Sequence, residues 1–419
     1  MTEKILITGI GMITPYGNGI DAVFQGIANR QLGYGPISEM DVSTLPIKVG
    51  GYIPAAKAEV TGLPHNKLKG MGKYVKLGIL AAKSAVEDAK IDLKSIPAGR
   101  IGAFVSSGTH GHNAEGLFGA FDVSRNSENR FDLKLLSSDG VDRVHPWWLL
   151  TTISNNLIFF ITHFLGIKGA NTNTCNSSVG GAYALDRAIE SMRSGEIDIA
   201  LVGGADSPLN WQMLSDLSLL KFLAEGDPGA LLPMQPFTAA ARGTVLSDAA
   251  AFLICETESR ARERNVKAYA EVDSTALFGK FQEMVSPSSD GQETATVLSR
   301  LFENVPAGGE TLVNASATCI EDWDKAELTG LRNCLTGKKA HVGSAKPWIG
   351  HTLSASFLLE TAISAVALRR QIGLPLPAGS PANSTGVTWS TPGHLKYAHA
   401  INLGQCFGGN TAGVLLNGL

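Results

Sequence analysis

The apolar residues of this chain gather in short continuous runs that end in glycine, serine or asparagine. Such runs are typical of strands that are buried on both faces, as in parallel or mixed sheets covered by helices. They predict strands at 5–17, which runs into a turn, and at 101–108, 197–206, 249–256, 268–272, 311–315, 397–403 and 413–416.

Between these runs, apolar residues recur at helical spacing. The segments concerned are 75–91, 182–192, 294–302, 323–334 and 346–370. Alternating strands and helices predict an α/β protein with helices on both faces of its sheets. Because the order of elements begins again near residue 268, we interpret 1–257 and 258–419 as two similar halves that arose by internal duplication.

Three further segments narrow the choice of structure and function. The polar stretch 111–146 is interpreted as an insertion or cap. The most apolar stretch, 147–167, is interrupted by polar residues, which favours a helix that is buried or packed on a partner over a membrane span. Gly9 and Gly11 follow the first run, but the third glycine of a dinucleotide fingerprint is missing, so nucleotide binding is disfavoured.

Composition narrows the functional classes. The chain has 419 residues and a net charge of −3, which gives no reason to expect a nucleic-acid partner. Its 5 cysteines are odd in number and show no CxxC spacing, which argues against a disulfide framework and a zinc site and favours a reducing compartment. The N-terminus does not resemble a signal peptide. We therefore expect a cytoplasmic protein without a metal site.

Cys175 is the first candidate for chemistry. It follows a short run that changes from apolar to polar, and it precedes small residues and the helical segment 182–192. This pattern predicts a strand, a tight turn carrying Cys175, and a helix whose N-terminus favours a thiolate. The alternative is a small buried cysteine, which the small polar neighbours disfavour.

Five segments then resemble, in order and in spacing, the β-ketoacyl-acyl-carrier-protein synthases of the thiolase fold, and especially the elongating ketosynthases. They contain Thr-Cys-Asn-Ser-Ser, Leu-Val-Gly-Gly-Ala-Asp, Asn-Ala-Ser-Ala-Thr with Asp-Lys-Ala-Glu, Lys-Pro-Trp-Ile-Gly-His and Gln-Cys-Phe-Gly-Gly-Asn, at 174–178, 201–206, 313–327, 344–353 and 404–410. The resemblance implies a duplicated five-layered αβαβα thiolase fold with two mixed sheets. It also implies a homodimer, or a heterodimer with another ketosynthase-like subunit.

The resemblance assigns roles to individual residues. Cys175 would carry an acyl group as a thioester, which suits the chemistry of an activated thiol. His351 and Lys346 would assist condensation, and the backbone N–H groups of Cys175 and Phe407 would form an oxyanion hole. Supporting residues would be Asp324, Glu327 and Glu360, which pairs with Lys346, and substrate gating would fall to Thr244, Phe407, Gly408 and Gly409. The phosphopantetheine arm of a carrier protein would be the substrate tether, with no other cofactor.

The sequence departs from the family at Ser316, where a second histidine is usual. Serine donates a hydrogen bond but carries no positive charge and is not a base near neutral pH. Losing such a donor typically costs about 3 kcal/mol of transition-state stabilisation. Decarboxylation of a malonyl unit is therefore affected more than acyl transfer to Cys175. Departures at 236–249, Glu283 and 405–406 surround the acyl entrance in the family fold and suggest an unusual substrate or reaction.

Three interpretations follow, in this order. The first is a ketosynthase-like enzyme of a specialised type II fatty-acid or polyketide pathway. The second is a partner subunit such as a chain-length factor, which the retention of Cys175 and His351 disfavours. The third is acyl transfer or cyclisation without decarboxylation, which Ser316 permits.

The expected partner is an acyl carrier protein. A cluster of lysines lies where the family docks this acidic partner, although such clusters are often only solvated helix faces. Its members are Lys67, Lys69, Lys73 and Lys76. Neither a nucleic acid nor a membrane is expected to bind.

Overall fold

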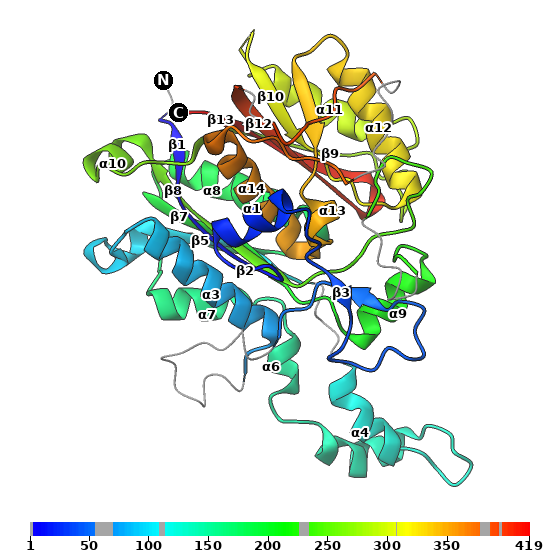
Figure 1. The fold of residues 1–419 in the computed structure, drawn as a ribbon. Coiled ribbons are helices and arrows are strands. Elements are labelled where there is room, and N and C mark those ends of the chain that lie inside the picture. The colour runs from blue at the N-terminus through cyan, green and yellow to red at the C-terminus, as the bar shows by residue number, and fades with distance from the viewer. Residues whose placement is uncertain are drawn as a thin grey trace.

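The computed structural model describes residues 3–54, 70–108, 114–225, 234–306, 308–377, 386–393 and 396–419. Its centre is a mixed eleven-stranded sheet flanked by helices (Figure 1). Ten of the strands form two sets of five, and β2 (Gly17–Asn18) pairs only with β1. A separate pair is formed by β3 (Gly35–Pro36) and β4 (Val49–Gly50).

The two sets of five strands have the same topology. The N-terminal set has the order β6-β5-β7-β8-β1, and the C-terminal set has the order β11-β10-β12-β13-β9. In each set the first three strands are parallel and the last two pairings are antiparallel. The strands are β1 (Ile5–Thr14), β5 (Ile101–Ser106), β6 (Asn171–Thr174), β7 (Ile199–Asp206), β8 (Ala249–Thr257), β9 (Ala270–Gly279), β10 (Glu310–Asn314), β11 (Ala340–Gly343), β12 (Tyr397–Cys406) and β13 (Asn410–Asn417). This repetition confirms the duplicated α/β architecture, while the boundary at 257 stays a prediction.

The two five-stranded sheets are joined at one edge. β1 pairs with β9 through Ile5–Val272, Leu6–Glu271 and Ile7–Ala270. The two sheets that the sequence predicts are therefore hydrogen-bonded into one continuous sheet.

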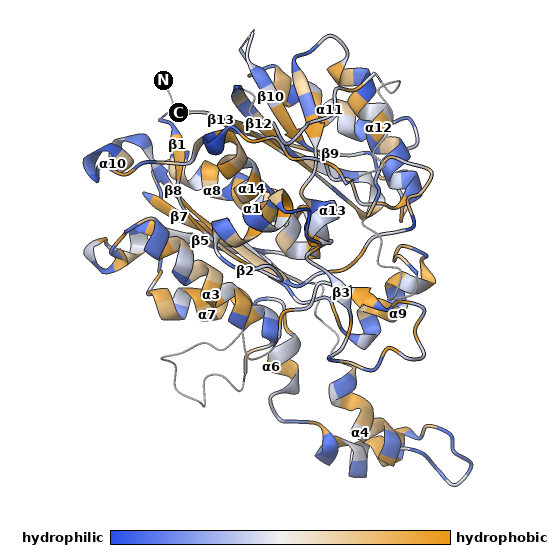
Figure 2. Cartoon of the chain, in the orientation of Figure 1, coloured by the Kyte–Doolittle hydropathy of each residue, from blue (hydrophilic) through white to orange (hydrophobic). Residues whose placement is uncertain are grey.

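Helices complete the five layers. α3 (Lys73–Asp88) and α7 (Asn156–Leu165) cover the outer face of the N-terminal sheet. α11 (Gln292–Phe302) and α12 (Glu321–Leu335) cover that of the C-terminal sheet. α8 (Gly180–Arg193) and α14 (Ser356–Arg370) fill the layer between the sheets. All residues of α14 except its two final arginines are buried, as expected of a helix in a central layer. Figure 2 shows hydrophobic residues on these central helices and on the strands.

Two predicted helices are interrupted. Segment 346–370 divides into α13 (Lys346–Ile349), a 3-10 turn at Leu353–Ala355 and α14, because Gly350 has a φ of +94° and His351 pairs with Leu246. Segment 147–167 divides into α6 (Trp148–Thr152) and α7. Within the described parts of the chain, no helix is both long enough and apolar enough to cross a bilayer.

Several elements were not predicted from the sequence. They are α1 (Ile20–Ala28), α9 (Trp211–Leu219), α10 (Glu258–Glu263) and β11. The polar insertion forms α4 (Glu115–Val123), α5 (Leu133–Leu135) and two short turns, which project from the body of the molecule (Figure 1).

Gly9 and Gly11 have a packing role. A Cβ atom on Gly11 would lie 2.0 Å from the carbonyl oxygen of Ala81, and one on Gly9 would lie 2.3 Å from that of Ala85. These glycines therefore let α3 approach β1 closely.

Candidate active site

Cys175 lies on the turn between β6 and α8, as the sequence predicts. Its side chain is exposed, so the alternative of a buried structural cysteine is wrong. The Asn173 amide donates to Sγ over 3.4 Å, and the Ser107 hydroxyl donates to Asn173 Oδ1 over 2.9 Å. Gly108 faces the thiol, where a Cβ atom would lie 2.8 Å from Sγ. The turn thus keeps one side of the sulfur open.

His351 is held against the same turn. Its N–H donates to the Val245 carbonyl over 2.7 Å, and its carbonyl accepts from the Ser247 N–H over 2.9 Å. Its Nε2 lies 2.9 Å from Ser178 Oγ, three residues after Cys175. Burial and the nearby Lys346 charge lower the pKa of His351 well below its usual value. The imidazole is therefore neutral at neutral pH.

Lys346 and Glu360 form a buried ion pair, as predicted, from Nζ to Oε1. The two side chains are only 1% and 3% exposed. Burial raises the pKa of Glu360, while the Lys346 charge opposes that shift. The pair fixes a positive charge next to His351.

Ser316 follows β10 and is buried. Its N–H donates to Glu327 Oε1 over 2.7 Å, and the Ala317 N–H donates to Oε2 over 2.8 Å. Burial raises the pKa of Glu327 to about 8. Glu327 therefore supports the backbone at Ser316.

Asp324 supports the next part of the same segment. Its carboxylate accepts from the N–H groups of Cys319 over 3.1 Å and Phe237 over 2.9 Å. Burial raises its pKa to about 7. Glu327 and Asp324 thus both hold backbone N–H groups, and in the described residues neither is hydrogen-bonded to the Cys175 thiol.

Two of the predicted gating residues, Phe407 and Thr244, both contact Phe222. Phe407 stacks on Phe222 with ring centroids 5.6 Å apart and meets the Trp323 ring edge-on at 5.7 Å. Thr244 is buried, and its N–H donates to the Phe222 carbonyl over 2.7 Å. Gly408 and Gly409 follow Phe407 with φ of +71° and +68°, which glycine adopts without strain.

Cys406 joins this loop to the nucleophile turn. Its thiol contacts the Asn176 carbonyl over 3.7 Å. The structure therefore brings the Phe407 loop next to the Cys175 turn.

Sequence reasoning missed Ser178, Asn173, Phe222 and Trp323. Ser178 lies within the Thr-Cys-Asn-Ser-Ser segment at 174–178, and its place in that segment was the only signal that could have indicated it. Phe222 and Trp323 contact Phe407 from segments that are remote in sequence. No diagnostic sequence pattern marks Asn173.

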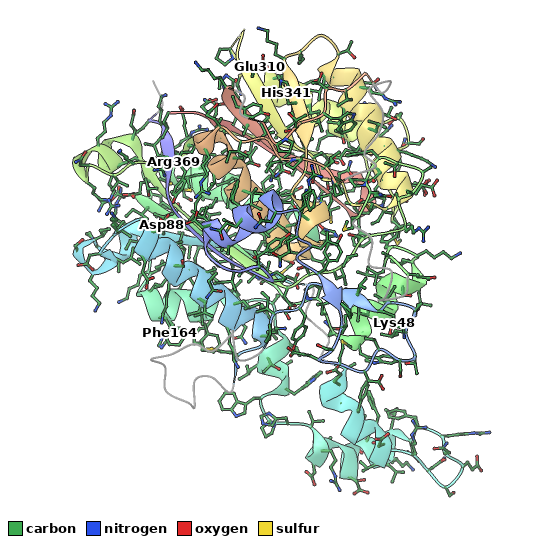
Figure 3. The ribbon with its side chains drawn as sticks, in the orientation of Figure 1. Lys48, Asp88, Phe164, Glu310, His341 and Arg369 are labelled. Carbon is green, nitrogen blue, oxygen red and sulfur yellow. The ribbon has the colours of Figure 1, made fainter. Side chains whose placement is uncertain are left out.

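His341 does not take the place of the second histidine. Its Nε2 lies 2.7 Å from Glu310 Oε2, and Figure 3 shows these two residues side by side. Glu310 begins β10, whereas Ser316 follows the end of that strand. His341 is therefore at the opposite end of the strand from the candidate site.

The lysine cluster is only partly described. Lys67 and Lys69 lie outside the described residues. Lys73 pairs with the buried Asp248 over 2.6 Å and lies over the Tyr52 ring at 3.3 Å. Lys73 is thus engaged within the molecule, and a carrier-protein contact at this cluster stays a prediction.

The duplicated five-layered fold, with a cysteine and a histidine brought to neighbouring turns, defines a thiolase-fold protein. The model of the β-ketoacyl synthase N-terminal domain matches residues 2–261, and that of the C-terminal domain matches 269–378. The chain belongs to the β-ketoacyl synthase family.

Curated relatives agree with this assignment, and solved structures share the fold. The chain is 24% identical over 423 residues to a Vibrio cholerae 3-oxoacyl-[acyl-carrier-protein] synthase 2, covering 99% of this chain and 98% of that protein. It is 23% identical over 371 residues to the Staphylococcus aureus (strain COL) protein of the same name, covering 88% and 86%. The ishigamide ketosynthase/chain length factor superposes with a TM-score of 0.84 at 19% identity, and a Burkholderia phymatum β-ketoacyl synthase with 0.83 at 20%, each over 100% of both chains.

Proposed function

We propose that this protein is a β-ketoacyl-acyl-carrier-protein synthase-like enzyme of a specialised type II fatty-acid or polyketide pathway. The observation that carries the proposal is the exposed Cys175 thiol on a turn that also hydrogen-bonds His351 through Ser178. In the first step the Cys175 thiolate attacks the thioester carbonyl of an acyl carrier protein. A bond from the acyl carbon to Cys175 forms as its bond to the carrier sulfur breaks, and the carrier leaves as a thiolate that takes up the proton Cys175 has released.

Condensation is the second step. A carrier-bound malonyl-type extender loses carbon dioxide, and the resulting carbanion attacks the acyl carbonyl on Cys175. A carbon–carbon bond forms as the carbon–sulfur bond to Cys175 breaks. His351 donates to the extender carbonyl oxygen, and the buried Lys346 charge stabilises the enolate. The N–H groups of Cys175 and Phe407 receive the oxyanion, and Ser316 supplies a neutral donor.

A second candidate is acyl transfer without decarboxylation. Ser316 favours it because this buried side chain carries no charge, whereas the developing enolate is an anion. Acylation of Cys175 is common to both candidates, so release of carbon dioxide separates them.

The proposed partners are an acyl carrier protein and a second ketosynthase-like subunit, identical or different. The curated relatives are named 3-oxoacyl-[acyl-carrier-protein] synthase 2, a name that includes the acyl carrier protein. A chain from the structure of a type II polyketide acyl-carrier protein in complex with its ketosynthase superposes on this chain with a TM-score of 0.81 at 19% identity. The Lys76 end of the lysine cluster is one candidate contact for the carrier.

Intact-mass analysis with an acyl carrier thioester tests the first step. We expect one acyl adduct on the wild type and none on Cys175→Ala. Absence of an adduct from the wild type with every acyl chain length tried would contradict the proposal.

Carbon dioxide release from a malonyl carrier protein tests the second step. We expect slow release by the wild type and release at least about 10-fold faster by Ser316→His, because a second cationic or N–H donor then faces the enolate. Since Ser316 is buried, a melting curve must show that Ser316→His is folded. Acylation without any carbon dioxide release would favour the second candidate.

A further inference from the structure

The hydrogen bond between Ser178 and His351 joins the two halves of the chain at the candidate site. The partners are 173 residues apart in sequence, and Nε2 lies 2.9 Å from Oγ. Their exposed fractions are 5% and 4%, so neither group has ready access to water as an alternative partner. The bond therefore contributes to the orientation of the imidazole in the resting protein.

The backbone of His351 is fixed by hydrogen bonds, so only its side chain can change position. Both its N–H and its carbonyl are bonded to the segment 245–247. The remaining freedom is rotation of the side chain and the choice of ring nitrogen that carries the proton. A partner at Nε2 restricts the rotation, and it favours a proton on Nε2 when it acts as the acceptor.

The proposed chemistry decides which nitrogen carries that proton. Because the imidazole is neutral, it has a single N–H. Donation to an extender carbonyl from the nitrogen that faces the Cys175 turn requires the proton on Nε2. The Ser178 oxygen then accepts this hydrogen in the resting state, and the substrate carbonyl takes its place on binding.

We propose that Ser178 is a positioning residue whose oxygen accepts the Nε2–H of His351, which stabilises this tautomer and orients the imidazole toward the reacting thioester. The proposal rests on the proposed function for its catalytic consequence, but the tautomer and orientation are properties of the free protein. Ser178 touches His351 and is not assigned to the reacting atoms.

Nuclear magnetic resonance of histidine-labelled full-length protein tests the tautomer directly. The chain has 9 histidines, and His351→Gln identifies the His351 signals. We expect a protonated Nε2 and a bare Nδ1 in the wild type, and a mixture of tautomers in Ser178→Ala. Ser178→Thr, which keeps the hydroxyl, should retain the wild-type pattern.

Ser177→Ala is the matched control because it removes the neighbouring hydroxyl, for which the described structure records no bond to His351. It should retain the tautomer of the wild type. A wild-type Nδ1–H tautomer, or an unchanged tautomer in Ser178→Ala, would overturn the proposal.

Kinetics with carrier thioesters separate positioning from folding. We expect Ser178→Ala to lower the condensation rate about 10-fold or more, with Cys175 acylation changed less than 3-fold, and Ser178→Thr to recover most of the loss. Equal loss of both steps would indicate a general structural role and overturn the proposal. If the wild type is not acylated at all, the proposed function fails, while the tautomer measurement still decides the role of Ser178.

Discussion

At the scale of single residues, accessibility distinguishes the cysteines. All five lie in the described part of the chain, and Cys175 is exposed whereas Cys255, Cys319, Cys334 and Cys406 are buried. Burial raises the pKa of Cys255 to about 12 and also raises that of Cys406. Those two thiols are therefore both protonated and shielded at neutral pH.

Limited alkylation tests this difference. Brief iodoacetamide treatment of the folded protein at neutral pH should modify Cys175 first, because its thiol is the accessible one. Peptide mass spectrometry locates the adduct, and Cys175→Ala should remain largely unmodified. Equal early labelling of a buried cysteine would contradict the structure.

A second prediction at the residue scale concerns the buried Lys346–Glu360 ion pair. Lys346→Met leaves an unpaired carboxyl group in the interior, so the free energy of unfolding should fall by about 3–5 kcal/mol in urea titrations. The double variant Lys346→Met/Glu360→Gln should recover part of that loss. Lys325→Met is the control, because its pair with Glu321 is exposed and should contribute nothing measurable. An equal effect of both lysine substitutions would refute the argument.

At the scale of elements, close packing places the catalytic turns. Cys175 follows the end of β6. Ser316 follows the end of β10, the strand that corresponds to β5 of the N-terminal set. α14 carries Glu360 through the central layer to Lys346 at the start of α13. These elements position the side chains because the layers they belong to are tightly packed.

The contact between α3 and β1 depends on glycine. Gly11→Ala should lower the free energy of unfolding by about 1–3 kcal/mol, since the added methyl group meets the Ala81 carbonyl at 2.0 Å. Gly99→Ala is the control because nothing lies within 4 Å of its Cβ position. Urea midpoints measure both variants, and an unchanged midpoint for Gly11→Ala would show that the helix shifts without cost.

At the scale of the whole molecule, the candidate site requires both halves. Cys175 and Ser178 come from one half, and His351, Lys346 and Ser316 come from the other. The second half also contains the buried carboxyl groups of Asp324, Glu327 and Glu360. The stability of the molecule is therefore linked to the protonation of its site.

The raised pKa of Glu327 determines whether stability rises or falls with pH. Its pKa is about 8 in the folded protein, against an ordinary value of 4.5 for an exposed glutamate, so the folded state binds a proton that the unfolded chain has released. The stabilising contribution is complete below about pH 4.5 and is lost as the pH rises toward 8. The free energy of unfolding of the wild type should thus fall across this window relative to Glu327→Gln, by roughly a few kcal/mol.

Urea titrations at several pH values measure this difference. Comparison with Glu327→Gln is needed because His351, whose pKa is lowered, produces the opposite trend: stability falls on acidification below its unfolded value of 6.5. A constant difference between wild type and Glu327→Gln at every pH would show that Glu327 keeps the same charge in both states.

Much of the fold could be predicted from the sequence because strands and helices here are local patterns. The apolar runs around β1, β5, β7 and β8 and the repeat after residue 268 indicated the duplicated α/β architecture. The splitting of 346–370 could not be predicted, because pairing of His351 with Leu246 is a tertiary contact that overrides helical periodicity.

The sequence by itself determined which residue types stand at the turns: Cys175 before a helix, His351 after Lys346, and serine at 316. Only the tertiary structure decided that Ser178 meets His351, that Lys73 is engaged by Asp248, and that β1 joins the two sheets through β9. The physical reason is range: hydrophobic spacing and turn chemistry act over a few residues, whereas these contacts depend on how packed layers bring distant segments together.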